Sequence, residues 1–425
     1  MAKTPEELYQ ERVKRIEDAI QLKVPDRIPL VPHPGFFPLK YAGITVQEAM
    51  YDYNKTYIAW KKTLSDFEWD GYYPPLLLSG YVFEHLDYRA LRWPGHGVKP
   101  TAPYQFVEPG QVIEGEREVY APMRAEDYDW FLDDPSDYMI RAYLPKIIGA
   151  LAPLTKLPPI HGIITHYQGL FDALPVVGTP EVLGALESIS KASVESLNWL
   201  NSLTAFIDEM EEMGFPAFFR NVASVPYDFI ANFLRGTRGA MIDMYRNPDK
   251  LLEAIEKVTP WQIQTAVDGA EATGTSRVAI FPHKGFKGLM SEEQYKIFYW
   301  PTFRQVILGI IDAGLTPFIF TEGDYTSRLE IIRDVPKWKV VYHIERDIFR
   351  AKEVLGDVAC LTGGPPSSLL CTGTVEEVKD YCKKLIDVVG KGGGYILNPE
   401  VPLIDEKPEN VKAMTDFFKE HGVYR

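Results

Sequence analysis

The sequence predicts an α/β fold, a TIM (β/α)8 barrel, from three observations. Short apolar runs rich in β-branched and aromatic residues recur along the chain, and several end in a side chain that can titrate or bind a metal. Segments with apolar residues at helical spacing lie between these runs. The chain has 425 residues, which suits one barrel with insertions. We therefore expect a single domain over residues 1–425.

Eight runs are predicted as strands, four before residue 316 and four from it onward. Because the parallel strands of a barrel all end at one face, residues far apart in the sequence can meet there. The predicted strands are Pro25–Pro32, Pro159–His166, Ala217–Ala223, Arg277–His283, Thr316–Glu322, Trp338–His343, Val358–Gly364 and Gly394–Glu400.

Helices are predicted where apolar spacing follows a start signal. Thr45 with Glu48 three residues later forms a capping box, and Asn247 before Pro248 places an N-cap ahead of a proline at the first helical position. Ser291 is predicted to cap another helix. The predicted helices are Pro5–Leu22, Thr45–Leu64, Tyr138–Leu151, Thr179–Met213 (one helix or two), Asp228–Met244, Asn247–Thr273 and Ser291–Ala313.

Residues 69–128 interrupt this alternation. The stretch is rich in proline, glycine and aromatic residues, and alternation over Gln111–Tyr120 predicts hairpins. It fits a lid, an insertion packed over the mouth of the barrel. It equally fits a β excursion whose aromatic side chains form a minor core of their own. Both readings stay open.

Composition limits the function classes. The 59 acidic and 45 basic residues give a formal charge of −14, which disfavours nucleic acid or an anionic membrane as a partner. The three cysteines form no Cys-x-x-Cys pair and are too few for a disulfide framework, so a cytoplasmic location is expected. The N-terminus lacks the apolar core of a secretory signal, and no apolar run is long enough to span a bilayer.

Polar side chains at the predicted strand ends are candidates for a site. A carboxylate directly after an apolar strand faces solvent or a site, whereas a lone histidine there more often makes an ordinary hydrogen bond. Glu322, His343 and Glu400 follow such runs and are candidates for one metal site. No compact metal motif such as His-Glu-x-x-His is present. The strand-end residues are His33, His166, His283, Glu322, His343 and Glu400.

Several segments stand in a telling order along the chain: Arg12–Pro29, Gly288–Tyr295, Trp300–Pro301, Gly323–Asp324, Leu361–Gly364, Gly373–Thr374, Glu376–Val378 and Pro408–Ala413. In these segments and their order the chain resembles the uroporphyrinogen decarboxylase superfamily. The superfamily contains decarboxylases and zinc-dependent methyltransferases that deliver a methyl group to or from a corrinoid. The family's arginine-bearing segment near the first strand is replaced here by residues 33–38, so the resemblance disfavours a porphyrinogen substrate.

The resemblance to the methyltransferase branch implies a metal site with altered ligands. That branch carries a cysteine before Gly-Asp and a second cysteine ten residues before the asparagine of a Glu-Asn pair, and glutamate stands at both places here, as Glu322 and Glu400. His343 completes the implied Zn2+ site, unless Glu345, two residues on, takes its place. Carboxylate and imidazole ligands leave zinc a strong Lewis acid, which suits the polarisation of an ether oxygen.

The resemblance therefore implies a zinc-dependent O-demethylase. Such an enzyme moves a methyl group from a methyl ether, most simply an aryl methyl ether, to the Co(I) of a separate corrinoid protein, since this chain has no Asp-x-His-x-x-Gly cobalamin signature. Because strand ends converge, Phe36, Phe37, His166 and Phe320 are expected to line the substrate pocket. His283 is expected either to donate a proton to the departing oxygen or to make an ordinary hydrogen bond.

Alternative functions and partners stay open at this point. The methyl donor could be a methylamine, methanol or a methyl thiol, or the chain could be a decarboxylase-like enzyme on a small acid or a non-catalytic binding protein. The 69–128 stretch, with Arg89, Arg92 and Lys99 among its aromatic residues, is the predicted docking surface for the corrinoid protein. It could instead only cover the substrate or complete a homodimer.

Overall fold

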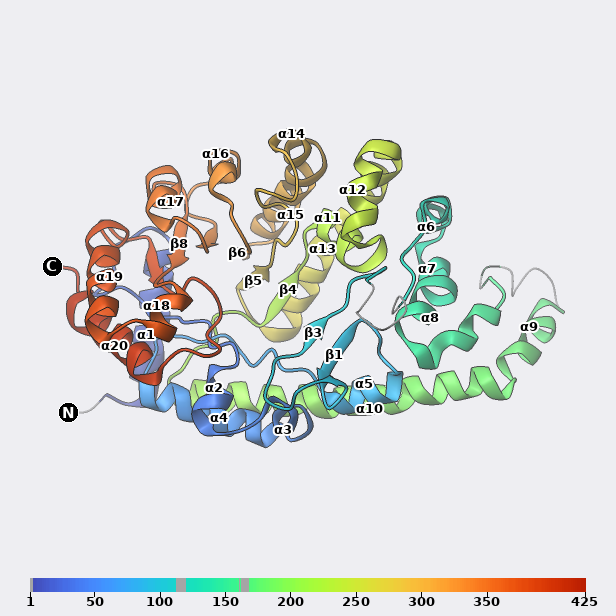
Figure 1. Cartoon of the computed structure of the whole chain (residues 1–425), viewed down its shortest axis with the longest axis horizontal. Coiled ribbons are helices and arrows are strands. Elements are labelled where there is room, and N and C mark those ends of the chain that lie inside the picture. The colour runs from blue at the N-terminus through green and yellow to red at the C-terminus, as the bar shows by residue number, and fades with distance from the viewer. Residues whose placement is uncertain (1–2, 112–119, 160, 162–167) are drawn as a thin grey trace.

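The computed structural model describes residues 3–111, 120–159, 161 and 168–425. Its centre is a six-stranded parallel sheet in which the strands follow one another in sequence order (Figure 1). This confirms six of the eight predicted strands, with shorter bounds. They are β4 Asn221–Ala223, β5 Arg277–Ile280, β6 Thr316–Thr321, β7 Val341–Ile344, β8 Cys360–Gly363 and β9 Tyr395–Leu397.

An extended first segment, residues 28–31, lies along β9. Leu30 forms a parallel bridge with Leu397. The backbone N–H of Val31 donates to the carbonyl oxygen of Leu397 at 2.9 Å, and the N–H of Leu397 donates to Pro29 at 2.8 Å. The predicted first strand is thus present as a short bridged segment beyond β9.

A second segment, residues 70–73, joins the first segment to the other edge of the sheet. The N–H of Asp70 donates to the carbonyl oxygen of Leu30 at 2.8 Å. Tyr72 forms a parallel bridge with Ala217, just before β4. Backbone bonds therefore run around a ring of eight extended segments, which is the arrangement of a TIM-like barrel.

The position of the second barrel segment corrects the sequence prediction. The strand predicted at Pro159–His166 lies largely outside the described residues. Its place in the ring is held by residues 70–73, at the start of the stretch that we assigned to an insertion. This segment escaped prediction because it is short, contains a glycine and lacks the aliphatic run that marks the other strands.

The inside of the ring is filled by aromatic side chains. Tyr73 of the second segment stacks on Phe218 at a centroid distance of 5.7 Å, and Phe218 meets the edge of Phe318 of β6 at 5.0 Å. Small residues, Ala279 on β5 and Cys360 on β8, share this interior and leave room for the rings. The barrel is therefore a packed core rather than a channel.

Helices cover the outside of the ring (Figure 1). Their apolar residues recur at spacings of three and four, so that one face of each is buried, as Leu251, Ile255 and Val258 show. The longer outer helices are α1 Pro5–Ile20, α12 Gly236–Arg246, α13 Pro248–Thr273, α15 Trp300–Asp312, α17 Ile348–Leu355, α19 Val375–Val388 and α20 Pro408–His421.

The helix predicted at Thr45–Leu64 is broken in the structure. The capping box of Thr45 and Glu48 is confirmed at the start of α3, Val46–Tyr51. At Asp52 the backbone becomes extended, and its carboxylate accepts a hydrogen bond from the N–H of Lys55 to begin α4, Tyr53–Phe67. A residue type that favours caps over helix interiors thus divides the segment.

Other helix predictions hold with changes of detail. The segment predicted as one helix or two at Thr179–Met213 is the single helix α10, Pro180–Glu212. Asn247 stands at the predicted N-cap position, but its amide donates to Asp243 at 3.0 Å instead of capping α13. The helices predicted at 138–151, 228–244 and 291–313 consist of shorter helical pieces.

The 69–128 stretch forms a small sheet and a helix after the second barrel segment. Strand β1 pairs parallel with β2 and antiparallel with β3, which agrees with a β excursion. The hairpin predicted over Gln111–Tyr120 lies largely outside the described residues. These elements are α5 Gly80–Leu86, β1 Leu91–Pro94, β2 Gly97–Val98 and β3 Gln105–Phe106.

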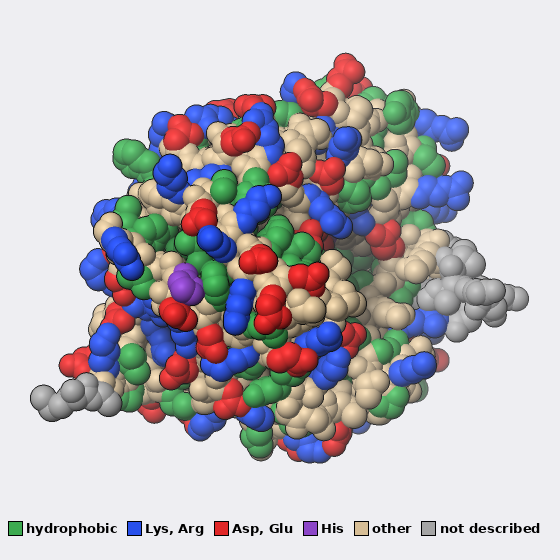
Figure 2. Space-filling view, turned by 60° about the vertical axis from the view of Figure 1, so that its left-hand side comes forward, with side chains coloured by type: hydrophobic (Ala, Val, Ile, Leu, Met, Phe, Trp, Pro, Cys, Tyr) green, Lys and Arg blue, Asp and Glu red, His purple; other side chains and the backbone are tan. Residues whose placement is uncertain are grey.

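The surface is of mixed charge. Figure 2 shows acidic and basic side chains interspersed over one face, without a large area of a single sign. No single helix in the described ranges is long and apolar enough to cross a bilayer. Helix α9, Gly169–Val177, and α10 meet the length and hydropathy requirement only as a pair, bent by 74° between them.

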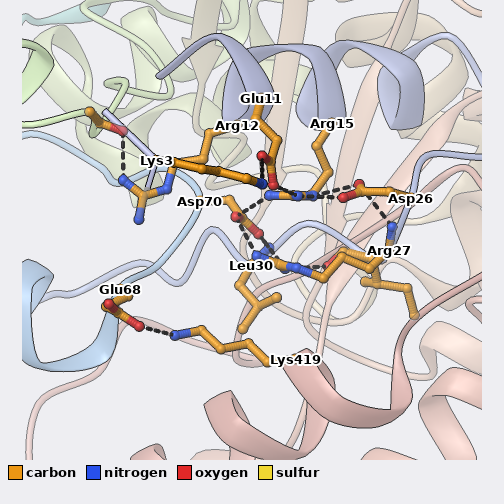
Figure 3. A network of polar contacts seen from close by, with 12 residues as sticks. Lys3, Glu11, Arg12, Arg15, Asp26, Arg27, Leu30, Glu68, Asp70 and Lys419 are labelled. Carbon is orange, nitrogen blue, oxygen red and sulfur yellow. Dashed lines mark hydrogen bonds and ion pairs between the residues drawn. The ribbon is translucent and has the colours of Figure 1, made fainter. Parts of the chain in front are cut away.

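A buried ion network joins the first two barrel segments to α1 (Figure 3). Asp70 is wholly buried, and its carboxylate accepts hydrogen bonds from Arg15 and Arg27 at 2.7 Å and from the N–H of Leu30 at 2.8 Å. Arg15 also pairs with Asp26. Two guanidinium groups and one backbone N–H thus satisfy the buried carboxylate, as burial of a charge requires.

We expect Asp70→Asn to destabilise the fold strongly. The change leaves two arginines without their shared anion while conserving the shape of the side chain, so the free energy of unfolding should fall by about 3 kcal/mol or more. Urea denaturation measures the loss. The control is Asp405→Asn, whose partner Lys40 is exposed at the surface, and a change of no more than about 0.5 kcal/mol is expected there. Equal effects of the two changes would contradict the role of Asp70.

Candidate functional site

A cavity of about 430 Å³ opens where the barrel segments end. His33 follows the first segment, His283 follows β5 and Glu322 follows β6, so the cavity lies at the C-terminal face of the ring. Its walls are mostly apolar. The lining residues are His33, Pro34, Gly35, Phe36, Trp60, Pro74, Leu76, Leu77, Tyr104, Phe106, Phe281, His283, Glu322, Pro402 and Ile404.

The 69–128 stretch supplies one wall of this cavity. Leu76, Leu77, Tyr104 and Phe106 all belong to it and line the cavity. Phe106 is 70% exposed, so its ring stands at the boundary between the cavity and the solvent. The stretch therefore lies over part of the barrel mouth.

An ion pair ties this cover to the barrel. The carboxylate of Glu108 lies 2.5 Å from the ammonium group of Lys284, in the loop after β5. It also accepts a hydrogen bond from the hydroxyl of Thr237 on α12 at 2.6 Å. The cover is thus fastened to the same loop that carries His283.

The residues expected to line the substrate pocket are divided between the cavity and the core. Phe36 lines the cavity, but Phe37 begins α2, Phe37–Ala42, and packs against Tyr41 and Phe67 away from it. Phe320 is 1% exposed and lies in the barrel interior. His166 lies outside the described residues.

His33 forms part of the cavity floor as a neutral ring. Its Nδ1 accepts a hydrogen bond from the N–H of Gly35 at 3.1 Å, so the proton of the neutral ring resides on Nε2. Burial, with a smaller contribution from nearby His343, lowers the pKa of His33 to about 3. Gly35 has φ +50°, and a Cβ there would lie 2.1 Å from the carbonyl oxygen of Leu403, so this turn requires glycine.

His343 is held by hydrogen bonds at both ring nitrogens. Its Nε2 donates to the carbonyl oxygen of Glu400 at 2.9 Å, and its Nδ1 accepts from the hydroxyl of Thr362 at 2.8 Å and the amide of Asn398 at 3.2 Å. The ring is wholly buried, stacks on Phe320 at 3.9 Å, and has its pKa lowered to about 4 by burial. Neither nitrogen has a free lone pair in this arrangement.

Three glutamates, Glu322, Glu345 and Glu400, form a rim after the C-terminal ends of β6, β7 and β9, near enough to repel one another, and of these three Glu322 also lines the cavity. Glu345 accepts a hydrogen bond from the N–H of Gly323 at 2.6 Å. Burial, followed by the charges of Glu322 and Glu400, raises its pKa to about 7. Burial also raises the pKa of Glu400, although Arg346 lies 3.1 Å away and opposes the shift. The rim therefore carries excess negative charge.

His283 is oriented toward this rim. Its Nδ1 lies 2.8 Å from the side-chain amide of Asn232, and its Nε2 lies 3.4 Å from a carboxylate oxygen of Glu322. Burial lowers the pKa of His283, but the hydrogen bond and charge of Glu322, together with the charge of Asp228, outweigh it and raise the pKa above the ordinary value.

Asp228 is a residue of the site that sequence reasoning missed. It is fully buried, and its carboxylate accepts hydrogen bonds from the N–H groups of His283 at 2.6 Å and Lys284 at 3.2 Å and from the hydroxyl of Tyr299 at 2.8 Å. Burial raises its pKa to about 6. Asp228 fixes the loop that carries His283. Its position within a predicted helix gave no signal of this role.

The rim fits a hard divalent cation in chemistry but does not form a coordination site as it stands. Oxygen donors of Glu322, Glu345 and Glu400 are the ligands that such cations accept, and a cation would relieve the excess negative charge. In the part of the chain that the structure describes, however, no three His, Cys, Asp or Glu side chains converge on one point. Of the two candidates for a third ligand, Glu345 lies in the carboxylate cluster, whereas the ring of His343 is occupied.

One protein family matches the part of the chain that contains most of these residues. Residues 222–421 match the uroporphyrinogen decarboxylase (URO-D) family. The URO-D match includes His283, Glu322, Glu345 and Glu400, but it leaves out the first two barrel segments and the cavity wall formed by residues 69–128. No curated protein matches the sequence.

The fold is that of a solved methyltransferase. The structure is similar to that of a methyltransferase from Methanosarcina mazei, with a TM-score of 0.58 over 96% of this chain and 98% of the other. The two sequences are 15% identical, so the likeness establishes the common fold. It confirms the predicted barrel-like α/β architecture along nearly the whole chain.

We expect the buried histidines to make the protein sensitive to acid. A histidine whose folded pKa is depressed stabilises the fold above the unfolded value of about 6.5 and loses that contribution as the pH falls toward the folded value. For His343, with a folded pKa of about 4, the loss by pH 4 is about 3 kcal/mol. His343→Gln retains a donor and an acceptor without titrating, so urea denaturation should show a smaller loss of stability between pH 7 and pH 4.

The control for this measurement is His96→Gln, which removes an exposed histidine. Its pH dependence should equal that of the unmodified protein. If His343→Gln and the unmodified protein lost the same free energy of unfolding between pH 7 and pH 4, the buried ring would not be the acid-sensitive group.

Proposed function

We propose that this chain is a methyltransferase that moves a methyl group from an aryl methyl ether to the Co(I) of a separate corrinoid protein. The observation that carries the proposal is the cavity at the C-terminal face of the barrel, which has apolar walls and places His283 and Glu322 at one edge. The fold likeness to a methyltransferase and the URO-D match support the reaction class.

The cavity suits a planar aromatic substrate better than a porphyrinogen. Its volume of about 430 Å³ lies in the range of small-molecule pockets, and Phe36, Tyr104 and Phe281 offer aromatic surface. None of the described residues that line it is arginine or lysine, so the carboxylates of a porphyrinogen would find no cationic partner there. The Nε2–H of His33 is a neutral donor for a polar substituent on the ring.

His283 is the proposed proton donor. Methyl transfer breaks the bond between the methyl carbon and the ether oxygen and leaves the electron pair on that oxygen. His283 lines the cavity, and the hydrogen bond and charge of Glu322 outweigh burial and raise the pKa of its ring, which favours the protonated imidazolium that can donate a proton to the departing oxygen. Asp228 positions His283 through the backbone and does not touch the cavity.

Glu322, Glu400 and a third rim residue are the proposed ligands of Zn2+. Of the two third ligands that the sequence left open, we favour Glu345, because His343 would have to give up a hydrogen bond and leave its buried position to reach a metal. A bound zinc ion would supply Lewis acidity that polarises the ether oxygen. The oxygen-rich donor set suits that role.

The 69–128 stretch remains the proposed docking surface for the corrinoid protein. It lies at the cavity mouth, where a second protein would have to approach, and Phe106 and Lys99 are exposed on it. Its attachment through Glu108 to Lys284 is the link that would have to open if the stretch moves as a lid.

The function is tested by following the cobalt spectrum. The protein is mixed with corrinoid protein reduced to Co(I) and with an aryl methyl ether such as a methoxybenzoate. Conversion to methylcobalt together with release of the phenol is expected. In the same assay, His283→Ala should slow transfer by about 100-fold and abolish the fall in rate at high pH that deprotonation of His283 causes.

Other methyl donors serve as the comparison in this assay. Methanol, a methylamine or a methyl thiol that methylates the cobalt while aryl ethers do not would redirect the substrate assignment. If no donor methylates demonstrably present Co(I), the methyltransferase proposal is wrong. Release of CO2 from small acids then tests the decarboxylase-like alternative, and a chain inactive in both assays would be a binding protein.

The metal assignment is tested by elemental analysis of purified variants. Glu322→Ala and Glu400→Ala should bind zinc at least about 10-fold more weakly than the unmodified chain, because each removes a ligand. Glu345→Ala should behave like them, and His343→Gln should keep its zinc. The control is Glu330→Ala, an exposed carboxylate on α16, Leu329–Ile332. Undiminished zinc in both Glu322→Ala and Glu400→Ala would refute the site.

A further inference from the structure

The outer face of helix α10 is apolar along much of its length. α10 runs along one edge of the molecule (Figure 1), and its inner face is buried through Val182, Ala185 and Ala192. A helix on the surface of a soluble domain normally turns charged residues outward. Here five large apolar side chains are 43–61% exposed: Leu183, Leu186, Val194, Leu197 and Leu200.

These side chains follow a heptad pattern. Positions 183, 186, 190, 193, 197 and 200 alternate spacings of three and four, which places them in one stripe along the helix, with Val194 beside it. Leucines occupy the first two and last two positions, and serines occupy the middle two. All six residues are exposed, and none of them is charged. Such a stripe is the seam by which two helices pack together.

The order of residues in the stripe is the same in both directions. Read from either end it is Leu, Leu, Ser, Ser, Leu, Leu. Two copies of α10 packed antiparallel about a twofold axis would therefore place Leu183 of one against Leu200 of the other and Leu186 against Leu197. The small serines at 190 and 193 would meet at the axis, where they allow the helices to approach closely. An isologous contact requires this self-complementarity, which an unrelated partner would not.

The surroundings of the stripe fit a second copy as well. Just before α10, the helix α9 exposes Leu170, Phe171 and Leu174. Helix α9 therefore adds exposed apolar surface close to one end of the stripe.

We propose that the stripe formed by residues 183, 186, 190, 193, 197 and 200 of α10 is a homodimer interface in which two copies of this chain pack antiparallel. The proposal goes beyond the methyltransferase function and does not depend on it. None of the six residues is among the described residues that line the cavity, so each copy retains its own site.

The oligomeric state tests the interface first. The full chain should sediment at twice 48.3 kDa, and Leu186→Glu combined with Leu197→Glu should halve that mass while circular dichroism stays unchanged. The matched control is Val388→Glu, which charges a 45% exposed apolar residue on α19 and should leave the dimer intact. A monomeric unmodified chain, or a dimer that survives the double change, would overturn the proposal.

Cross-linking tests the antiparallel register. In a Cys371→Ser background, a mixture of Leu183→Cys and Leu200→Cys chains should form an intermolecular disulfide under mild oxidation. Each variant alone should not, because equal positions lie about 25 Å apart along antiparallel helices. Cross-linking of either variant with itself would indicate a parallel pair and refute the register.

Vesicle flotation tests the alternative occupant of this face. α9 and α10 together have the length and hydropathy of a bent membrane segment, so a lipid bilayer is the competing ligand. Vesicles of phosphatidylcholine, with and without an anionic lipid, should not carry the unmodified chain on flotation. A chain that floats with the vesicles, and no longer does so after Leu186→Glu and Leu197→Glu, would assign the stripe to a membrane surface instead.

Discussion

The buried pairing of Asp70 with Arg15 and Arg27 is the constraint on which the ring depends. The second barrel segment is short and has few backbone bonds to its neighbours, so its own ladder holds it weakly. The carboxylate of Asp70 ties it to α1 and to the first segment. Since the same segment carries Tyr73, whose ring lies 4.5 Å from that of His33, an ion network at one end of the barrel fixes the cavity floor at the other.

The histidine layer beneath the cavity and the glutamate rim of the barrel differ in how their polar side chains are paired. His33, which lines the cavity, and His343, which lies in the barrel interior, are buried, neutral and hydrogen-bonded, which makes that layer rigid and costly to protonate. At the rim, Glu322, Glu345 and Glu400 lie near one another, and burial together with the two like charges raises the pKa of Glu345 to about 7. Negative charge that no cation of the fold neutralises can interact with a bound ligand. We therefore expect the reaction to take place at the rim, and the buried histidine layer to hold the surrounding residues in position.

The sequence predicted elements that depend on a single residue pattern. It did not predict features that depend on tertiary packing or on how deep a side chain lies in the barrel. Aliphatic runs located six strands, but the convergence of strand ends, from which we expected Phe320 to line the pocket, does not say how far below the mouth a side chain lies. Phe320 and His343 are register partners on β6 and β7, and both are buried in the barrel interior. Asp228 could not be found because its partners, two backbone N–H groups 55 and 56 residues away, come close to it only once the chain is folded.

The part of the chain between the second barrel segment and β4 contributes to the cavity on one side and to the proposed dimer interface on the other. Its inner side supplies Tyr104 and Phe106 to the cavity and is fastened to the barrel through Glu108. Its long helix α10 buries one face against α5 and the neighbouring helical turns, and leaves the leucine stripe outward. Because no residue of the stripe reaches the cavity, assembly and chemistry place independent demands on the insertion. A substitution that introduces charge into the stripe should therefore change the oligomeric state without altering the cavity. The two roles can thus be separated in one set of variants.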